Sequence, residues 1–189
     1  MTLLNGLYLN YNHLTGNLPE TVGQLSQLRE FYLFHNALNG TIPASIGLLK
    51  EVEIISLGEN KFTGPIPIGL NNLQNLRVLS LQREEAEQDP NQFFMVVQDV
   101  GLTGDIIPFN NTPKLRELYL GENHLEGDIP SDFLLGIDDS SSTITVELSS
   151  NMFHGAIPAS LVRFDDLRLD LTGNSLREIP NEFCSKTGA

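Results

Sequence analysis

Cysteine, basic residues and long apolar runs are all scarce in this chain of 189 residues. The single cysteine, Cys184, cannot close an internal disulfide. Lysine and arginine total 11 against 24 aspartates and glutamates, so the formal net charge is −13, and neither nucleic acid nor an anionic membrane surface is expected as the main partner. No apolar run approaches the roughly 18 residues of a membrane span. No signal peptide is visible and repeated sequence begins beside Met1, so we expect a piece of a longer protein.

One phrase, best seen as LFHNALNGTIP in residues 33–43, recurs seven times. In the clearest copies an asparagine has apolar residues five and three positions before it, and glycine and proline four and seven positions after it. These asparagines are Asn12, Asn36 and Asn60, spaced by 24 residues. Glycine and proline in these copies exclude a continuous helix, and one short strand per copy cannot pair with itself. The pattern therefore predicts a coil in which each strand runs parallel to the strand of the next copy.

The later copies depart from this spacing. The fourth carries an insert of about 16 residues, and the stretch 82–99 has an acidic start and an apolar end. We expect its apolar end to pack on the flank of the coil; the alternative is a loop that leans over the concave face and shapes a site. The sixth copy has about four extra residues within 136–143. In the seventh, Glu178 replaces the glycine, and residues 175–189 are typical of a terminal cap.

The phrases LYLNYNHLTGNLP, FYLFHNALNGTIP, LYLGENHLEGDIP and VELSSNMFHGAIP resemble the plant-type leucine-rich repeat, LxLxxNxLxGxIP. The resemblance implies an α/β leucine-rich-repeat solenoid over residues 1–189, with a parallel sheet on the concave face and short extended or 3-10 segments on the convex face. It also implies a non-catalytic module, without cofactor, that binds a protein, peptide or glycan at the cell surface or outside the cell, as in receptor-like ectodomains or secreted inhibitors. The alternative function is a structural or adhesion spacer. Cys184 resembles the start of a C-terminal cap whose disulfide partner would lie beyond Ala189; otherwise it is a lone buried thiol.

The repeated residues have structural roles. Apolar residues alternate with exposed ones, as a half-buried strand requires. The asparagine follows the strand, where its amide can pair with backbone groups and stack from copy to copy, so Asn36→Ala should cost about 1–3 kcal/mol of stability. The glycine permits a positive φ or close contact with the next coil. The proline holds an extended stretch.

Function is therefore expected at the variable positions that face the concave surface. The candidates for ligand binding are Tyr8, Tyr11, Tyr32, Phe34, His35, Glu59, Arg83, Tyr119, Glu122, Glu147 and Asp170. The first two copies supply aromatic residues, which either anchor a peptide or sugar or cover an exposed edge. The later copies supply acids, which either form a solvated face or attract a basic peptide.

Glu147 and Asp170 provide the test for an enzyme. They occupy the same slot on neighbouring strands, so their backbones should lie about 4.8 Å apart, and paired carboxylates near this spacing can act as a retaining glycosidase. An open sheet excludes little water, so we do not expect catalysis. His13 and His124 share a register but lie four copies apart, roughly 19 Å, so a shared metal site is not expected.

Two asparagines begin N-glycosylation sequons. They are Asn39, in Asn-Gly-Thr, and Asn110, in Asn-Asn-Thr. Such triplets arise often by chance in an asparagine-rich chain, and they give weak support to a secreted origin.

Overall fold

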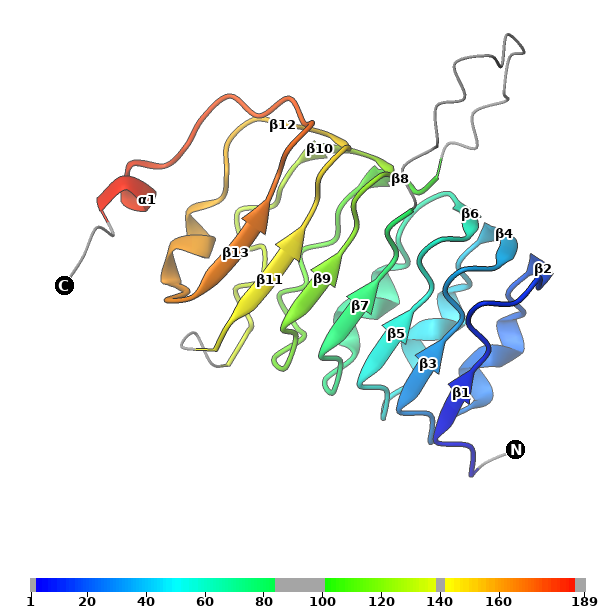
Figure 1. Cartoon of the computed structure of the whole chain (residues 1–189). Helices are drawn as coiled ribbons and strands as arrows, with labels where there is room; N and C mark the ends of the chain where they lie inside the picture. Colours follow the sequence, from blue (N-terminus) through cyan, green and yellow to red (C-terminus); the bar gives the residue numbers. More distant parts are fainter. Residues whose placement is uncertain (1–2, 84–100, 139–141, 186–189) are drawn as a thin grey trace, which may run out of the picture.

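The computed structural model describes residues 3–83, 101–138 and 142–185. The chain winds into a coil with its two ends at opposite extremities (Figure 1). A seven-stranded parallel sheet runs along one side in the order β1-β3-β5-β7-β9-β11-β13. Its strands are β1 (Gly6–Tyr8), β3 (Glu30–Tyr32), β5 (Ile54–Ser56), β7 (Val78–Ser80), β9 (Glu117–Tyr119), β11 (Ile144–Glu147) and β13 (Leu167–Asp170).

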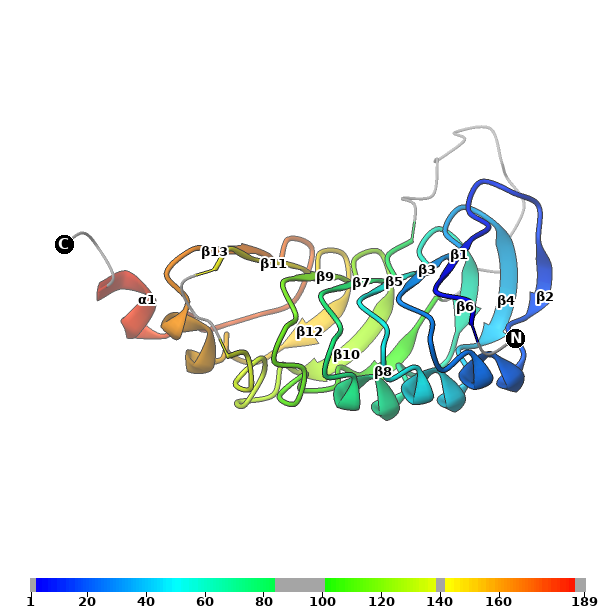
Figure 2. The same ribbon diagram turned by 90° about the horizontal axis from the view of Figure 1, so that it is seen from below.

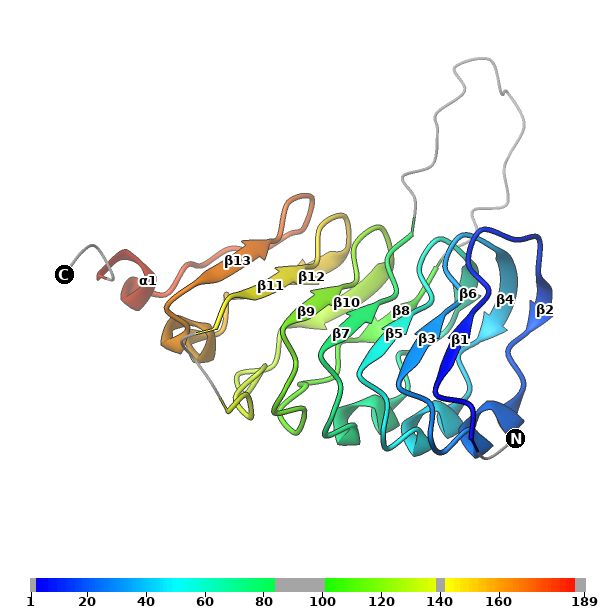
Figure 3. The same ribbon diagram turned by 60° about the horizontal axis from the view of Figure 1, so that its bottom comes forward.

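A second set of strands follows the turns at the carboxyl ends of the first. The strands of this set are β2 (Thr15–Asn17), β4 (Ala37–Thr41), β6 (Lys61–Thr63), β8 (Thr103–Asp105), β10 (His124–Asp128) and β12 (Met152–His154). They form two parallel sheets, β2-β4-β6 and β12-β10-β8, which a bridge between Gly64 and Leu102 connects. Figure 3 shows the turns after β9, β11 and β13 as a row along one edge of the coil.

Short helices occupy the convex side, away from the seven-stranded sheet (Figure 2). Among the described residues, four are 3-10 helices and one, near the C-terminal end, is α-helical. They are η1 (Glu20–Gln24), η2 (Ala44–Leu48), η3 (Ile68–Asn72), η4 (Ala159–Arg163) and α1 (Asn181–Ser185). An extended proline precedes each 3-10 helix, because proline fixes φ and has no N–H that would need a partner at a helix start.

The core lies between these layers. In β3, β5, β7 and β9 the middle residue is buried and its two neighbours are half-exposed, which is the predicted alternation. Buried leucines and isoleucines from the convex side, such as Ile46, Leu49 and Leu70, complete each layer. The predicted leucine-rich-repeat solenoid is confirmed.

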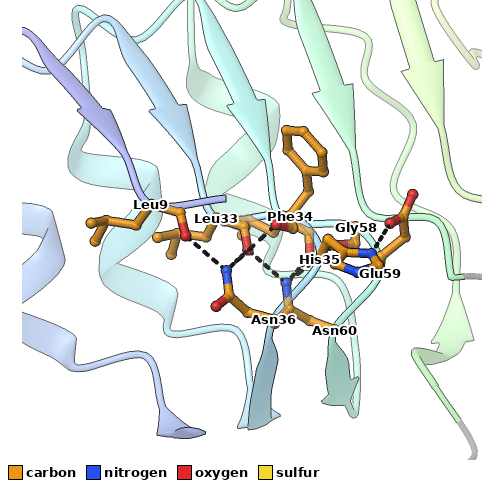
Figure 4. Close-up of polar contacts among 9 residues, drawn as sticks. Leu9, Leu33, Phe34, His35, Asn36, Gly58, Glu59 and Asn60 are labelled. Carbon is orange, nitrogen blue, oxygen red and sulfur yellow. Dashed lines mark hydrogen bonds and ion pairs between the residues drawn. The ribbon is translucent and has the colours of Figure 1, made fainter. Parts of the chain in front are cut away.

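The predicted asparagine ladder is also present (Figure 4). Asn60 is 7% exposed. Its Nδ2 donates to the carbonyls of Leu57 and Gly58 in its own coil, at 3.0 and 3.1 Å, and of Leu33 in the preceding coil, at 3.0 Å. Its Oδ1 accepts the Leu38 N–H at 3.0 Å. The same bonding to two coils recurs at Asn36, Asn123, Asn151 and Asn174.

Two positions of each regular coil have a left-handed backbone. The first is the predicted glycine: Gly40, for example, has φ +70°, and a Cβ there would lie 2.6 Å from the Asn17 side chain of the preceding coil. Sequence analysis missed the second, which immediately precedes the asparagine. The residues there with φ between 50° and 56° are Tyr11, His35, Glu59, Glu122 and Ser150.

Two sequence predictions remain open. Only Gln82 and Arg83 of the insert 82–99 lie within the described residues. Cys184 falls in α1, and residues 186–189 lie outside the described part, so the cap disulfide stays a prediction. Within the described residues, no helix is long and apolar enough to cross a membrane.

Candidate ligand-binding surface

The outward face of the seven-stranded sheet carries one column of side chains, which lie in register from strand to strand and come from the slot between the two apolar residues of each copy. Tyr8 pairs with Tyr32, and the pairing continues through Ser56 and Ser80 to Tyr119. Beyond Tyr119 the column ends with Glu147 and Asp170. One side chain per coil is therefore held at a fixed height on a rigid scaffold.

Sequence analysis missed a second outward column, two residues before the first. Its members are Gly6, Glu30, Ile54, Val78, Glu117, Thr145 and Arg168. The signal that could have found it is the alternation itself, because residues two apart on a strand share a face.

The aromatic residues of the first two coils form one cluster. The rings of Tyr8 and Tyr32 stack with centroids 5.5 Å apart and planes 16° from parallel. Phe34 meets Tyr32 edge-on, at 6.4 Å between centroids. The Tyr11 ring contacts the rings of both Phe34 and His35, at 4.9 Å between centroids in each case. Tyr8 and Tyr11 are 60% and 66% exposed, so this cluster presents its rings to solvent.

Carboxylates of the second column fix the tyrosine hydroxyls. The Tyr8 hydroxyl donates to Glu30 Oε2 at 2.5 Å, and the Tyr119 hydroxyl donates to Glu117 Oε2 at 3.0 Å. The hydrogen bond to Glu30 raises the pKa of Tyr8. Burial, followed by the charges of Glu30 and Glu117, raises the pKa of Tyr32. Burial, followed by the hydrogen bond to Glu117, raises the pKa of Tyr119. These three phenols therefore stay neutral at pH 7.

The residues just before the asparagine lie at the rim of the sheet instead of on its strands. Tyr11, His35 and Glu59 line an open pocket of about 520 Å³, together with Asn12, His13, Thr15, Asn36 and Ala37. His35 Nδ1 lies 2.8 Å from Glu59 Oε2, which joins the second and third coils (Figure 4). Glu122 occupies the equivalent turn of the fifth coil. The predicted candidates thus divide between a sheet surface and a rim.

Arg83 is half-buried and ends the first described segment. A Cβ on Gly101 would lie 2.9 Å from Arg83 Cδ, so Gly101 lies beside the Arg83 side chain. Arg83 is separate from the aromatic cluster of the first two coils.

The two carboxylates of the glycosidase alternative are each held within their own coil. Glu147 accepts hydrogen bonds from the N–H of Ser149, at 2.9 Å, and from its hydroxyl. Asp170 accepts the Thr172 N–H at 2.9 Å, and this bond and one from the Thr172 side chain lower the pKa of Asp170. A lowered pKa opposes the proton donation that a glycosidase requires of one carboxyl. Within the described residues, no group of three or more His, Cys, Asp or Glu could hold a metal ion.

The two sequons differ in structure. Asn39 is exposed on β4. Asn110 is half-buried: its Nδ2 donates to Asp132 Oδ2 at 2.5 Å and its Oδ1 accepts from Asn71 at 2.8 Å. A glycan on Asn110 would replace one hydrogen of this Nδ2 and would have to fit beside both contacts.

Comparison with known proteins agrees with the repeat architecture. Residues 3–25, 27–49, 114–134 and 167–186 match the family model of the leucine-rich repeat. The chain is a plant-type leucine-rich repeat protein. It resembles the Arabidopsis receptor kinase HAESA, solved with the peptide hormone IDA and the co-receptor SERK1, with 31% identity and a TM-score of 0.80 over 98% of this chain. It also resembles the plant peptide hormone receptor RGFR1, solved with RGF2, with 31% identity and a TM-score of 0.77 over 93% of this chain.

This leucine-rich repeat protein spans 28% of the HAESA chain and 25% of the RGFR1 chain. A plant ice-binding protein, 21% identical with a TM-score of 0.59 over 93% of this chain and 66% of its own, shares the fold. No curated protein sequence matches the chain.

Proposed function

We propose that this leucine-rich repeat protein is a non-catalytic recognition module that binds a peptide on the outward face of its seven-stranded sheet. The observation that carries the proposal is the aromatic cluster of the first two coils, in which Tyr8 and Tyr32 lie on strands, Tyr11 and Phe34 follow them, and Tyr8 and Tyr11 are exposed. Large rings that are already ordered supply contact area at low entropic cost. The resemblance to receptors solved with peptide hormones supports a peptide over a glycan, and it supports a location at the cell surface or outside the cell.

The charge of the surface favours a basic peptide. Glu30 and Glu117 stand in the second outward column, and Glu147 and Asp170 end the first. The formal net charge of −13 acts in the same direction. Complementary charge increases the association rate and suppresses acidic partners, and the effect weakens with salt.

The test is a peptide array and a glycan array probed with the wild-type chain and with a Tyr32→Ala, Phe34→Ala variant. The matched control is Leu48→Ala, Ile68→Ala, which removes two exposed apolar side chains, 58% and 66% accessible, from η2 and η3 on the convex side. We expect peptides that the control retains and the aromatic variant loses, with thermal unfolding as the check that each variant folds.

A structural spacer is the competing function. It predicts that no peptide binds, or that peptides bind equally to the aromatic and the convex variants. Either result would contradict the proposal.

A further inference from the structure

Two strands of the sheet present the same outward pair of residues, a glutamate and a tyrosine. They are β3, with Glu30 and Tyr32, and β9, with Glu117 and Tyr119. Strand pairing places both pairs in one register across β5 and β7. Three strand spacings separate β3 from β9, which is about 14 Å. We call these four residues the Glu–Tyr frame.

The two strands inside the frame present only small or apolar neutral residues. In the tyrosine column they carry Ser56 and Ser80, and in the glutamate column Ile54 and Val78. All four are half-exposed. The frame therefore surrounds an uncharged surface, here called the floor, in which Ile54 and Val78 form an apolar row and Ser56 and Ser80 form a hydroxyl row.

The orientation of Tyr32 makes it one wall of this floor. Tyr8 and Tyr32 stack nearly parallel, 16° apart, from neighbouring coils, so the ring planes lie across the axis of the coil. The side of Tyr32 opposite Tyr8 is toward the slot of Ser56 on β5, where the side chain is short, and Phe34 meets the Tyr32 ring edge-on at 6.4 Å between centroids. A planar group of a ligand can lie against this face as a third member of the stack.

The charges around the floor are negative. The carboxylates of Glu30 and Glu117 each receive a tyrosine hydroxyl at Oε2, and a carboxylate can accept several hydrogen bonds. Both charges act on the Tyr32 phenol. Two of the nearby cations are engaged outside the frame: Arg29 pairs with Glu53 at 3.0 Å, and Arg116 donates to the carbonyls of its own turn. The charge of Arg168, two strands beyond Glu117 in the same column, also acts on the Tyr119 phenol.

We propose that the Glu–Tyr frame binds one arginine side chain of an extended peptide, with its guanidinium stacked on Tyr32 and its stem over Ile54 and Val78. Arginine fits because it is planar, cationic and has an apolar stem, and because its donors match carboxylates in pairs. Lysine has the charge but neither the plane nor the fork. This inference rests on the proposed peptide-binding function and specifies the residue that the site selects.

The experiment uses fluorescently labelled heptapeptides whose central residue is arginine, lysine or citrulline, with flanking residues taken from the array. Citrulline keeps the shape of arginine and lacks its charge. We expect the wild-type chain to bind the arginine peptide about tenfold more tightly than the citrulline peptide, since a charge-assisted, stacked contact exceeds a neutral one by about that factor.

Variants then locate the site. Glu30→Gln, Glu117→Gln should reduce the arginine-to-citrulline ratio to about one, whereas Glu126→Gln, an exposed glutamate of β10 outside this sheet, should leave it within about twofold. Ser56→Tyr should abolish arginine-peptide binding without unfolding the chain, because tyrosine already occupies this slot at Tyr8, Tyr32 and Tyr119.

The outcomes separate the two proposals. Peptides that bind with no preference for arginine, or that bind the Ser56→Tyr variant unchanged, overturn the Glu–Tyr frame and leave peptide recognition standing. A wild-type chain that binds no peptide overturns both.

Discussion

Removal of the Asn60 side chain tests how the solenoid is held together. Asn60→Ala leaves the Leu38 N–H, which is buried, without its acceptor, and removes the donor to the carbonyls of Leu33, Leu57 and Gly58. One buried unsatisfied backbone group costs about 1–3 kcal/mol. Carbonyls tolerate a lost donor better than an N–H tolerates a lost acceptor, so we expect a total loss of about 3 kcal/mol.

The matched control is Asn12→Ala, the same substitution in the same phrase. Asn12 is exposed, and its recorded hydrogen bonds, both 3.1 Å, reach only the carbonyls of Leu9 and Asn10 in its own coil. Water can replace these bonds, so we expect a loss below about 1 kcal/mol. If the amide acted only through the turn of its own coil, the two variants would lose the same free energy.

Urea denaturation followed by circular dichroism measures both variants. A difference of about 2 kcal/mol between them corresponds to a lower melting temperature of about 4–8 °C for Asn60→Ala in a chain of this size. The slope against urea must also be compared, because repeat arrays can unfold in parts and a changed slope would indicate a partly unfolded intermediate. Equal losses at the two positions would refute the role of the ladder between coils.

Three further predictions concern single positions. Gly40→Ala should destabilise by about 1–2 kcal/mol more than Gly16→Ala in the same urea assay, because both have positive φ but a Cβ collides with the preceding coil only at Gly40; equal losses would contradict this. Asp170→Asn should destabilise the chain near neutral pH and not at acidic pH. The folded-state pKa of Asp170 is lowered, so the carboxylate stabilises the fold above its unfolded pKa of about 3.9, and this stabilisation is lost as the pH falls through the folded-state pKa. Melting temperatures of both chains across pH measure the effect, and a difference in melting temperature that did not change with pH would refute it. In a secretory expression host, a glycosidase-sensitive mass should disappear in Asn39→Gln and persist in Asn110→Gln, which the reverse pattern would contradict.

The sequence predicts the fold well because the period determines it. A regular copy needs an apolar pair for the core, an asparagine for the backbone at the strand end, and a glycine where the neighbouring coil comes close. Asn60 and Gly40 illustrate this. Asn60 accepts a hydrogen bond from Leu38, and Gly40 lies against Asn17; both partners belong to the preceding coil, and the register of the repeats alone identifies them. The repeat period predicts less about the contacts of side chains that vary from copy to copy.

The candidate surface was predicted only in part for the same reason. The register placed Tyr8, Tyr32 and Tyr119 in one column, and the structure has them there. It could not indicate that the Tyr8 hydroxyl reaches Glu30, because that contact depends on side-chain rotamers. The second outward column was overlooked, although strict alternation implies it.

The left-handed turn before each asparagine explains why some predicted residues are at the rim. A left-handed backbone costs a non-glycine residue about 1 kcal/mol, yet the chain places Tyr11, His35 and Glu59 there. Among the turns that the structure describes, glycine takes this position at Gly173. In each of these turns the ladder amide donates to the two carbonyls that precede the left-handed residue, so we attribute the conformation to the asparagine and not to the residue that adopts it. The type of residue at this position is then not restricted by the turn, and its side chain is directed away from the strand. The asparagine that joins the coils therefore also fixes the turn between two surfaces: the sheet surface, where Tyr32 stacks, and the rim pocket, where Tyr11 and His35 lie.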